Sequence, residues 1–312
     1  MISLSLAMLM GDTAFGLEKD IIVLGTATPG GGFPVYGAVF SQAVNQVDPT
    51  LEIQPRNTKG SIENVSLLEE SKLDMALVQG ETLNQALLGV GIKPFKLKII
   101  SAMYSTPGMF VVRADSPYNC IQDLVGKPIV FGARGSGLVT LARNILDGIG
   151  FDLDRDFKAI YLDRASDGPL MLLEGRAVAM WGGGLGWPGF EAVAAKAPSG
   201  ARFIAPNQEE IIRILAKHPL LRRMTVPGGS YSGQNSPIFS VGTWSFVLAR
   251  PDFPEDVAYR LANAVHKAEA VMTAHLPQAR ETTMANTVMM KPNQDLIHPG
   301  VTRYQREIGL SR

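Results

Sequence analysis

The stretch IIVLGTATPGGGFPVYG, residues 21–37, constrains the fold of this chain more than any other. It opens with four apolar residues that are followed by Gly and Pro, a pattern typical of a buried strand. The glycines at 30–32 predict a tight turn, and the apolar spacing after Pro34 predicts a helix. Such a unit points N–H groups of the helix N-terminus beyond the sheet edge, where a carboxylate can bind. The glycines are also compatible with a purely structural turn.

The same strand–turn–helix arrangement recurs along the first third of the chain. A strand at 51–54 leads into the polar turn NTKGS, in which Ser61 is predicted to be the N-cap of the next helix. A strand at 75–78 ends at Gln79 and is followed by another helix. Repeated units of this kind predict an open α/β sheet with helices on both faces. Ligands bind such sheets beyond the carboxyl ends of the strands, so these turns are expected on one rim.

A second α/β unit with its own glycine-rich rim is predicted further along the chain. Separate strands are expected at 98–104 and 110–113, and the next strand ends in GARGSG before a helix at 138–146. A later strand ends in GGGLGWP, residues 182–188. The segment 217–236 is rich in Pro, Gly and Ser and predicts a long ordered loop or a domain crossing. After a strand at 241–248 and a long helix, residues 281–285 are expected to continue helical.

Composition excludes several classes of function. The 312 residues contain 29 Lys plus Arg and 29 Asp plus Glu, and this balance argues against nucleic-acid binding. Cys120 is the single cysteine, so a disulfide framework or a cysteine-based zinc site is impossible within one chain. The four histidines are scattered and form no metal-binding pair. No cofactor motif is found, because the glycine turns match neither a P-loop nor GxGxxG.

The first sixteen residues resemble an export signal. They contain an apolar run from Ile2 to Met10 and small residues at Ala14 and Gly16, where a signal peptidase would cleave. No Lys or Arg precedes the apolar run, which is atypical, and an apolar N-terminus on a cytoplasmic protein is the alternative. We therefore expect an exported, periplasmic protein with residues 1–16 as its signal peptide.

Two α/β units with facing glycine-rich rims predict a ligand cleft closed by hinge motion. The expected division places residues 17–105 and 241–312 in lobe 1 and residues 106–240 in lobe 2, with crossings near Tyr104 and Thr243.

Motifs spread over most of the chain together resemble one family, the TAXI class of solute receptors of TRAP-type transporters. The matching pieces are residues 25–37, NTKGSIEN at 57–64, DMALVQ at 74–79, DLVGK at 123–127, GSG at 135–137, VPGGSY at 226–231, VGT at 241–243 and HPGVTRY at 298–304. The resemblance implies an α/β type II periplasmic-binding-protein fold. It also implies a monomer that captures a small organic anion, often a dicarboxylate or an amino acid such as glutamate, and delivers it to a membrane permease.

The resemblance, together with the residues themselves, gives a set of candidate ligand contacts. The sharpest hypothesis is that Arg134 grips a carboxylate through two parallel hydrogen bonds, although a solvated loop arginine is the alternative. The family usually has a small residue at this position and an aromatic pair where this chain has FPVY. The full candidate set is Thr26, Gly31, Gly32, Phe33, Tyr36, Thr58, Gly60, Ser61, Asn64, Gln79, Tyr104, Arg134, Gly135, Ser136, Gly137 and Trp187.

Two other functions stay open at this level. An enzyme on the same fold, such as a transferase or a cofactor-pyrimidine synthase relative, would need a nucleophile or base. Only His218, His266 and Cys120 are uncommitted candidates for that role. A sensory binding module that signals to a membrane partner is the third hypothesis. No catalytic set is recognised in the sequence, so a non-enzymatic receptor is expected.

Overall fold

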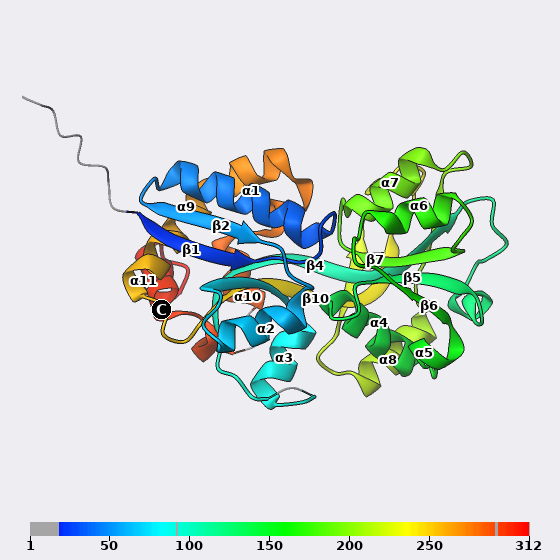
Figure 1. The fold of residues 1–312 in the computed structure, drawn as a ribbon, viewed down its shortest axis with the longest axis horizontal. Helices are drawn as coiled ribbons and strands as arrows, with labels where there is room; N and C mark the ends of the chain where they lie inside the picture. Colours follow the sequence, from blue (N-terminus) through cyan, green and yellow to red (C-terminus); the bar gives the residue numbers. More distant parts are fainter. Residues whose placement is uncertain (1–18, 92, 291–292, 312) are drawn as a thin grey trace, which may run out of the picture.

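The computed structural model of the chain describes residues 19–91, 93–290 and 293–311. These residues form two α/β lobes that lie side by side (Figure 1), as the sequence predicts.

The strands are β1 (Asp20–Gly25), β2 (Leu51–Arg56), β3 (Met75–Gln79), β4 (Lys98–Arg113), β5 (Pro128–Gly132), β6 (Lys158–Tyr161), β7 (Ala179–Gly183), β8 (Ala201–Ile204), β9 (Arg222–Val226) and β10 (Ile238–Ala249). The α-helices are α1 (Gly32–Val47), α2 (Ser61–Glu69), α3 (Gly80–Leu88), α4 (Gly137–Gly148), α5 (Leu153–Asp156), α6 (Asp167–Leu173), α7 (Pro188–Lys196), α8 (Gln208–Lys217), α9 (Glu255–His275), α10 (Met284–Met290) and α11 (Pro299–Glu307). Short 3₁₀ helices span Ile121–Leu124, Pro277–Glu281 and Gln294–Leu296.

Two long strands connect the lobes. The strand order is β2-β1-β3-β10-β4-β7-β5-β6, with β8 paired to β4 and β9 paired to β10. The first part of β4, up to Pro107, pairs with β10, and its last part, from Gly108, pairs with β7 and β8. The prediction of two strands at 98–104 and 110–113 is therefore wrong. The intervening residues stay extended and carry one continuous strand across the junction (Figure 1).

The first lobe contains β1–β3, α1–α3 and α9–α11, and the second lobe contains β5–β9 and α4–α8. Within the first lobe β1 runs parallel to β2 and β3, and within the second β5 runs parallel to β6 and β7. Parallel strands end at a common edge, and in both lobes that edge faces the junction. The predicted lobe boundaries, 105/106 and 240/241, fall inside β4 and β10 and stay a prediction. The predicted signal peptide, residues 1–16, lies outside the described residues.

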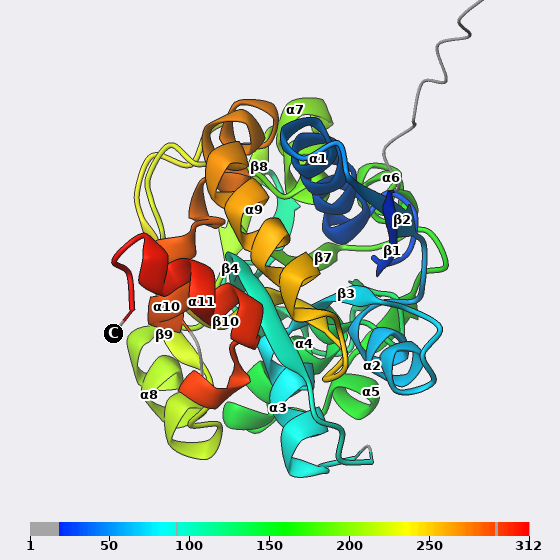
Figure 2. The same cartoon turned by 90° about the vertical axis from the view of Figure 1, so that its left-hand side faces the viewer.

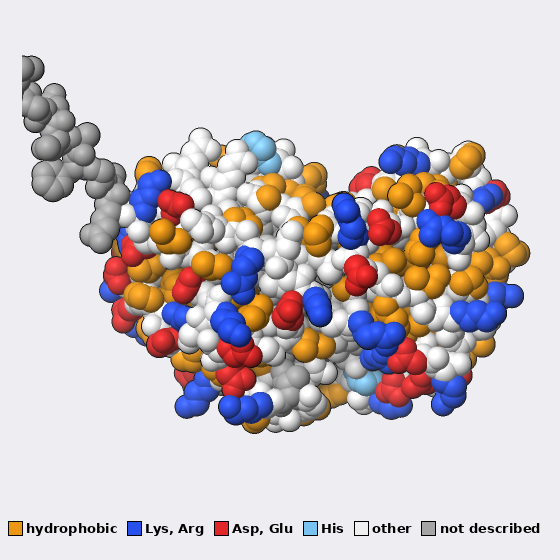
Figure 3. Space-filling model, viewed as in Figure 1, with side chains coloured by type: hydrophobic (Ala, Val, Ile, Leu, Met, Phe, Trp, Pro, Cys, Tyr) orange, Lys and Arg blue, Asp and Glu red, His pale blue; other side chains and the backbone are white. Residues whose placement is uncertain are grey.

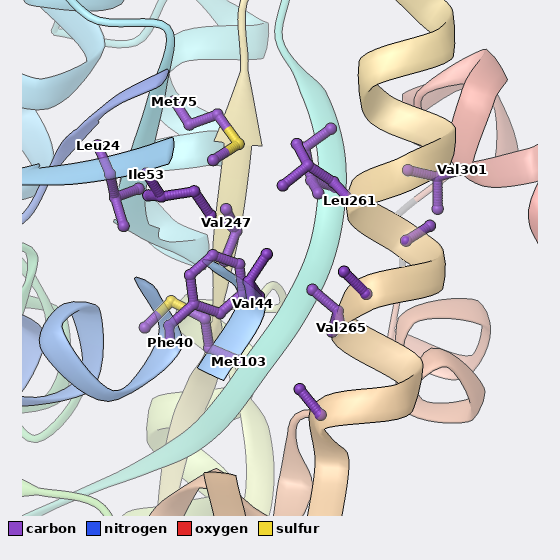
Figure 4. Close-up of a cluster of buried hydrophobic side chains, with 14 of the residues drawn as sticks. Leu24, Phe40, Val44, Ile53, Met75, Met103, Val247, Leu261, Val265 and Val301 are labelled. Carbon is purple, nitrogen blue, oxygen red and sulfur yellow. The ribbon is translucent and has the colours of Figure 1, made fainter. Parts of the chain in front are cut away.

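Apolar clusters fill both faces of each sheet. In the first lobe, α1, α9 and α11 cover one face (Figure 2), and Phe40, Met103 and Val265 are among the side chains buried there (Figure 4). Truncating a core phenylalanine such as Phe40 to alanine typically costs about 3–5 kcal/mol of folding free energy. The helices α2 and α3 cover the other face. This packing holds the strand ends and the turns after them in fixed positions. None of the helices described combines the length and apolarity that a membrane crossing requires.

Three local predictions are wrong. The N-cap of α2 is Gly60, and Ser61 is the first helical residue. The Ser61 Oγ accepts a hydrogen bond from Gln79 N at 3.1 Å. The segment 217–236 is not all loop, because β9 forms within it and pairs with β10. The helical continuation expected at 281–285 is broken, since one 3₁₀ helix ends at Glu281 and α10 begins only at Met284.

Candidate functional site

A partly enclosed cavity of about 90 Å³, which we call the inner cavity, lies between the two lobes. Its walls are formed by strand ends and by the turns and first helical residues that follow them, as expected for an α/β sheet. The lining residues are Ala27, Thr28, Gly31, Gly32, Phe33, Gly60, Ser61, Gln79, Tyr104, Thr106, Val130, Gly132, Ala133, Ser136, Gly137, Leu138, Leu162, Ala165, Met180, Trp181, Gly183 and Trp187. None of them is Asp, Glu, Lys, Arg or His.

The first residues of three helices reach the inner cavity. The helices α1 and α2 approach from the first lobe through Gly32 and Ser61, and α4 approaches from the second lobe through Gly137. The N–H groups of a first helical turn have no acceptor within their helix, and the helix dipole adds partial positive charge there. The cavity is thus electropositive without containing a cationic side chain.

Buried polar atoms without a partner also line the inner cavity. Gln79 and Thr106 are 4% and 3% exposed, and within the described residues neither Gln79 Oε1 nor Thr106 Oγ1 has a hydrogen-bond partner. A buried polar group without a partner costs about 1–3 kcal/mol, so these atoms are candidate ligand contacts. Burial raises the pKa of Tyr104 well above its usual range, so its hydroxyl stays protonated and can donate.

The two lobes touch around the cavity. Ala165 N donates to Pro29 O at 3.0 Å, and Ile62 N donates to Gly135 O at 3.4 Å, each bond linking the second lobe to the first. Gly60 adopts φ of 115°, and a Cβ on it would lie 3.2 Å from Ser136 Cα in the opposite lobe. Glycine is needed there for its backbone conformation and for the close approach of the lobes. These backbone contacts join the two lobes beside the cavity.

A second, open space of about 540 Å³ adjoins the inner cavity, and we call it the outer groove. Both spaces are lined by Thr28, Ala133 and Leu162. In contrast to the inner cavity, the outer groove carries charged side chains of both signs. They are Lys59 and Glu63 from the first lobe and Arg134 and Asp163 from the second.

Arg134 lies outside the inner cavity. Its guanidinium carbon is 3.9 Å from the ring centroid of Tyr161, an arrangement that favours cation–π attraction. The Tyr161 hydroxyl donates to Asp154 Oδ1 at 2.5 Å and accepts from Arg143 Nη2 at 3.0 Å. This network holds the exposed Arg134 side chain against the wall of the outer groove. The hypothesis that Arg134 grips a ligand carboxylate does not fit the inner cavity.

The structure brings most of the other predicted site residues together. Ten line the inner cavity: Gly31, Gly32, Phe33, Gly60, Ser61, Gln79, Tyr104, Ser136, Gly137 and Trp187. Thr58 and Gly135 line the outer groove together with Arg134. Ligand binding by these residues stays a prediction.

Three predicted residues lie in neither space, because each has a structural role. Asn64 donates through Nδ2 to the carbonyls of Thr26 and Leu77, at 2.8 Å each, and so ties α2 to β1 and β3. Thr26 is fully buried and donates to Arg56 O at 3.1 Å. Tyr36 is packed into the core of the first lobe, where its hydroxyl hydrogen-bonds Thr282 at 3.1 Å. Their contributions to binding are therefore indirect.

Several lining residues were missed by the sequence analysis. Thr106 is the most informative, because it is a polar side chain of β4 that lines the cavity at the lobe junction, as Tyr104 does. Its signal was a Thr-Pro pair interrupting the apolar run at 98–113. Val130, Leu162 and Met180 give no signal, since apolar residues in and after strands are usually core.

A comparison with known protein families identifies the family to which this chain belongs. The match to one family spans residues 24–309. The chain belongs to the NMT1-like family. That match covers both lobes and every residue of the inner cavity.

Solved structures share the fold of this NMT1-like chain at low sequence identity. MatC from Rhodopseudomonas palustris, with bound malate, is 13% identical with a TM-score of 0.58, and the alignment covers 92% of this chain and 98% of that one. A periplasmic transporter is 15% identical with a TM-score of 0.57, covering 93% and 98%. The alkanesulfonate-binding protein SsuA from Xanthomonas axonopodis pv. citri, bound to MOPS, is 16% identical with a TM-score of 0.50, covering 93% and 85%. The fold is that of periplasmic binding proteins, which confirms the predicted fold class.

Proposed function

We propose that this protein is a periplasmic solute receptor of the TAXI class, which encloses a small organic anion between its lobes and delivers it to a TRAP-type membrane permease. The observation that carries the proposal is the convergence of three helix N-termini, from both lobes, on one enclosed cavity. An anion bound there gains contacts with both lobes only when they are closed, so binding favours closure. The neighbours that bind malate and MOPS support an anion as the ligand.

The chemistry of the inner cavity favours a receptor over an enzyme. Its two serine hydroxyls already accept hydrogen bonds, Ser61 from Gln79 N and Ser136 from Val139 N. No lining residue has a carboxylate, imidazole, thiol or amine that could act as a general base. Of the candidates for catalysis, His218 is paired with Asp147 at 2.8 Å, and neither it nor the exposed Cys120 lines the cavity.

A thermal-shift screen tests the proposal. The protein is heated with organic acids, amino acids, 2-oxo acids and sugars, because a ligand that binds only the folded state stabilises it by about 2.7 kcal/mol at one hundred times its Kd. A rise in Tm with organic acids and not with sugars is expected. A rise with sugars or cations alone contradicts the proposal.

Two further measurements separate the alternatives. NMR spectra of the bound acid after prolonged incubation should show it unchanged, whereas conversion to a product would indicate an enzyme. Uptake of the labelled acid into proteoliposomes that hold a TRAP-type permease from the same organism should require this protein. A neighbouring histidine kinase in place of a permease would favour the sensory module.

A further inference from the structure

We propose that the inner cavity selects a small monocarboxylate with an uncharged body, and that the carboxylate binds at the N-terminus of α1. The inference rests on the proposed function, because it specifies which organic anion the receptor takes. It differs from the sequence-based expectation in two respects. It excludes amino acids and dicarboxylates, and it replaces the Arg134 guanidinium by uncharged donors.

The cavity wall at the first turn of α1 presents several hydrogen-bond donors. A Cβ on Gly32, the first residue of α1, would lie 3.2 Å from Trp187 Nε1 and 3.5 Å from Tyr104 Oη, so both groups flank the first helical turn. Within the described residues, neither the Trp187 indole N–H nor the Tyr104 hydroxyl makes a hydrogen bond, although Tyr104 is only 4% exposed. Together with the N–H groups of Gly32 and Phe33, they form a cluster suited to a carboxylate.

The α1 helix is also the strongest of the three dipoles that reach the cavity. It is 16 residues long, whereas α2 and α4 have 9 and 12. Its first turn carries no acidic residue that would compete with a ligand anion. The second-lobe residue Trp187 approaches this turn from the opposite side, so the carboxylate would contact both lobes.

A different part of the cavity wall, next to Gly137, suits a neutral polar group. A Cβ on Gly137 would lie 2.5 Å from Gln79 Oε1 and 2.8 Å from Ser61 Oγ, which shows how closely these groups pack across the lobes. An amide offers both an acceptor and a donor, so Gln79 can pair with a hydroxyl or a carbonyl. The first turns of α2 and α4 also reach this part of the cavity, but Ile62 N and Val139 N already donate to Gly135 O and Ser136 Oγ. The unpartnered Gln79 Oε1 would therefore repel a second carboxylate there. A hydroxyl or keto group on the ligand body therefore fits this part of the wall.

The middle of the cavity excludes charge and large size. Side chains such as Phe33, Val130 and Met180 line it, and no acidic side chain is present to pair with an ammonium group. Burying an ion without a partner costs several kcal/mol. The volume of about 90 Å³ is smaller than the roughly 150 Å³ of an engineered cavity that holds benzene, so the part of the ligand that lies inside it has few heavy atoms.

A matched set of four-carbon ligands tests this inference by isothermal titration calorimetry. Butyrate and 4-hydroxybutyrate keep one carboxylate, 2-aminobutyrate adds an ammonium, succinate adds a second carboxylate, and butanamide removes the charge. The two monoacids should bind at least about 30-fold more tightly than the other three, which corresponds to roughly 2 kcal/mol. Tighter binding of 2-aminobutyrate or succinate overturns the inference but leaves the anion receptor intact. Selective binding of sugars or butanamide would contradict the proposed function as well.

A pair of tryptophan variants tests the position of the carboxylate. Trp187→Phe keeps a ring in the cavity wall but removes the indole N–H, and it should weaken monoacid binding by about 10-fold. Trp244→Phe is the matched control, since Trp244 does not line the cavity, and it should leave the Kd unchanged. Equal Kd values for both variants and the wild type, with unchanged Tm, would place the carboxylate elsewhere.

Discussion

The inner cavity and the outer groove adjoin each other and differ in how they carry charge. Lys59, Glu63, Arg134 and Asp163 line the groove, while no charged side chain lines the cavity. Charged side chains of both signs are visible along the surface at the lobe junction (Figure 3). Water screens the charges of the open groove, so they contribute little to binding a ligand. In the proposed binding mode the inner cavity uses backbone dipoles, which need no desolvation of an ion when the lobes close.

Under the proposed function, the more charged region is not the binding region. In the enclosed space, with its lower dielectric, each aligned dipole or hydrogen bond contributes more than it would in the groove. The sequence suggests Arg134 as a carboxylate ligand, yet in the structure its side chain lies against Tyr161 and is exposed to solvent. Equivalent substitutions in the two regions should therefore have very different effects on ligand binding.

The largest difference is expected when one negative charge is added to each region. Gln79→Glu changes a buried cavity amide into an acid, and Asn57→Asp makes the same change in the outer groove. For charges about 6 Å apart at an effective dielectric of about 20, repulsion is roughly 3 kcal/mol, or about 100-fold in affinity.

Titration calorimetry of the two variants should show this loss for Gln79→Glu and less than about a 3-fold loss for Asn57→Asp. The loss in Gln79→Glu should grow as pH rises, because only the ionised glutamate repels the ligand. Similar losses in both variants would mean that the ligand anion lies between the two spaces.

The next effect concerns Glu81, a buried acid in the first lobe that does not line the cavity. Burial raises the pKa of Glu81 to about 8 from an ordinary value of 4.5. Both carboxyl oxygens lack a hydrogen-bond partner within the described residues. The folded state keeps the proton to a higher pH than the unfolded chain does. The free energy of unfolding is therefore highest below pH 4.5, the ordinary pKa of the acid in the unfolded chain. It falls as pH rises towards the folded pKa of about 8.

Glu81→Gln should remove this loss, raising the unfolding free energy near pH 8 by on the order of 2 kcal/mol. Urea unfolding between about pH 5 and pH 8 measures it. Glu63→Gln is the matched control, because Glu63 lies in the outer groove and accepts a hydrogen bond from Lys59 N at 2.5 Å. A pH slope in Glu81→Gln as steep as that of the wild type would contradict the assignment of the buried acid.

A smaller effect is expected from removing one hydroxyl in each region. Tyr104→Phe removes a donor from the inner cavity, and a hydrogen bond to a charged group contributes about 1.5–3 kcal/mol. We expect at least about 10-fold weaker monoacid binding. Tyr161→Phe makes the same change in the outer groove and should leave the Kd unchanged. The comparison fails if Tyr161→Phe is the more damaging of the two.

The smallest effect is expected from Arg134→Ala. Its guanidinium is exposed and stacked on Tyr161, outside the inner cavity. We expect less than about a 3-fold change in Kd, with the remaining change abolished by added salt. A loss of 100-fold or more, insensitive to salt, would restore the hypothesis that this arginine grips the carboxylate.

Much of the fold and part of the candidate site could be predicted from the sequence. The glycine turns after strands bring Gly32, Ser61 and Gly137 to the inner cavity, since a strand–turn–helix unit has one compact geometry. Gln79 was found because an amide at the end of a buried apolar strand is unusual. These patterns lie within short stretches of sequence, so they can be recognised without knowledge of the tertiary structure.

The remaining assignments depend on contacts that no local pattern contains. The α1 helix begins at Gly32, before Pro34, and its phase turns Tyr36 towards the core. The partner of Arg134 is Tyr161, which is distant in the sequence and lies on a different strand. Thr106 faces the cavity because β4 crosses the junction at that point.

A crystal structure of the complex with the acid of highest affinity tests the central claim most directly. We predict that the carboxylate oxygens lie within about 3.2 Å of the backbone nitrogens of Gly32 and Phe33 and of Tyr104 Oη, with the body of the ligand in the inner cavity. A carboxylate bound in the outer groove, to Arg134 or Lys59, would contradict the account.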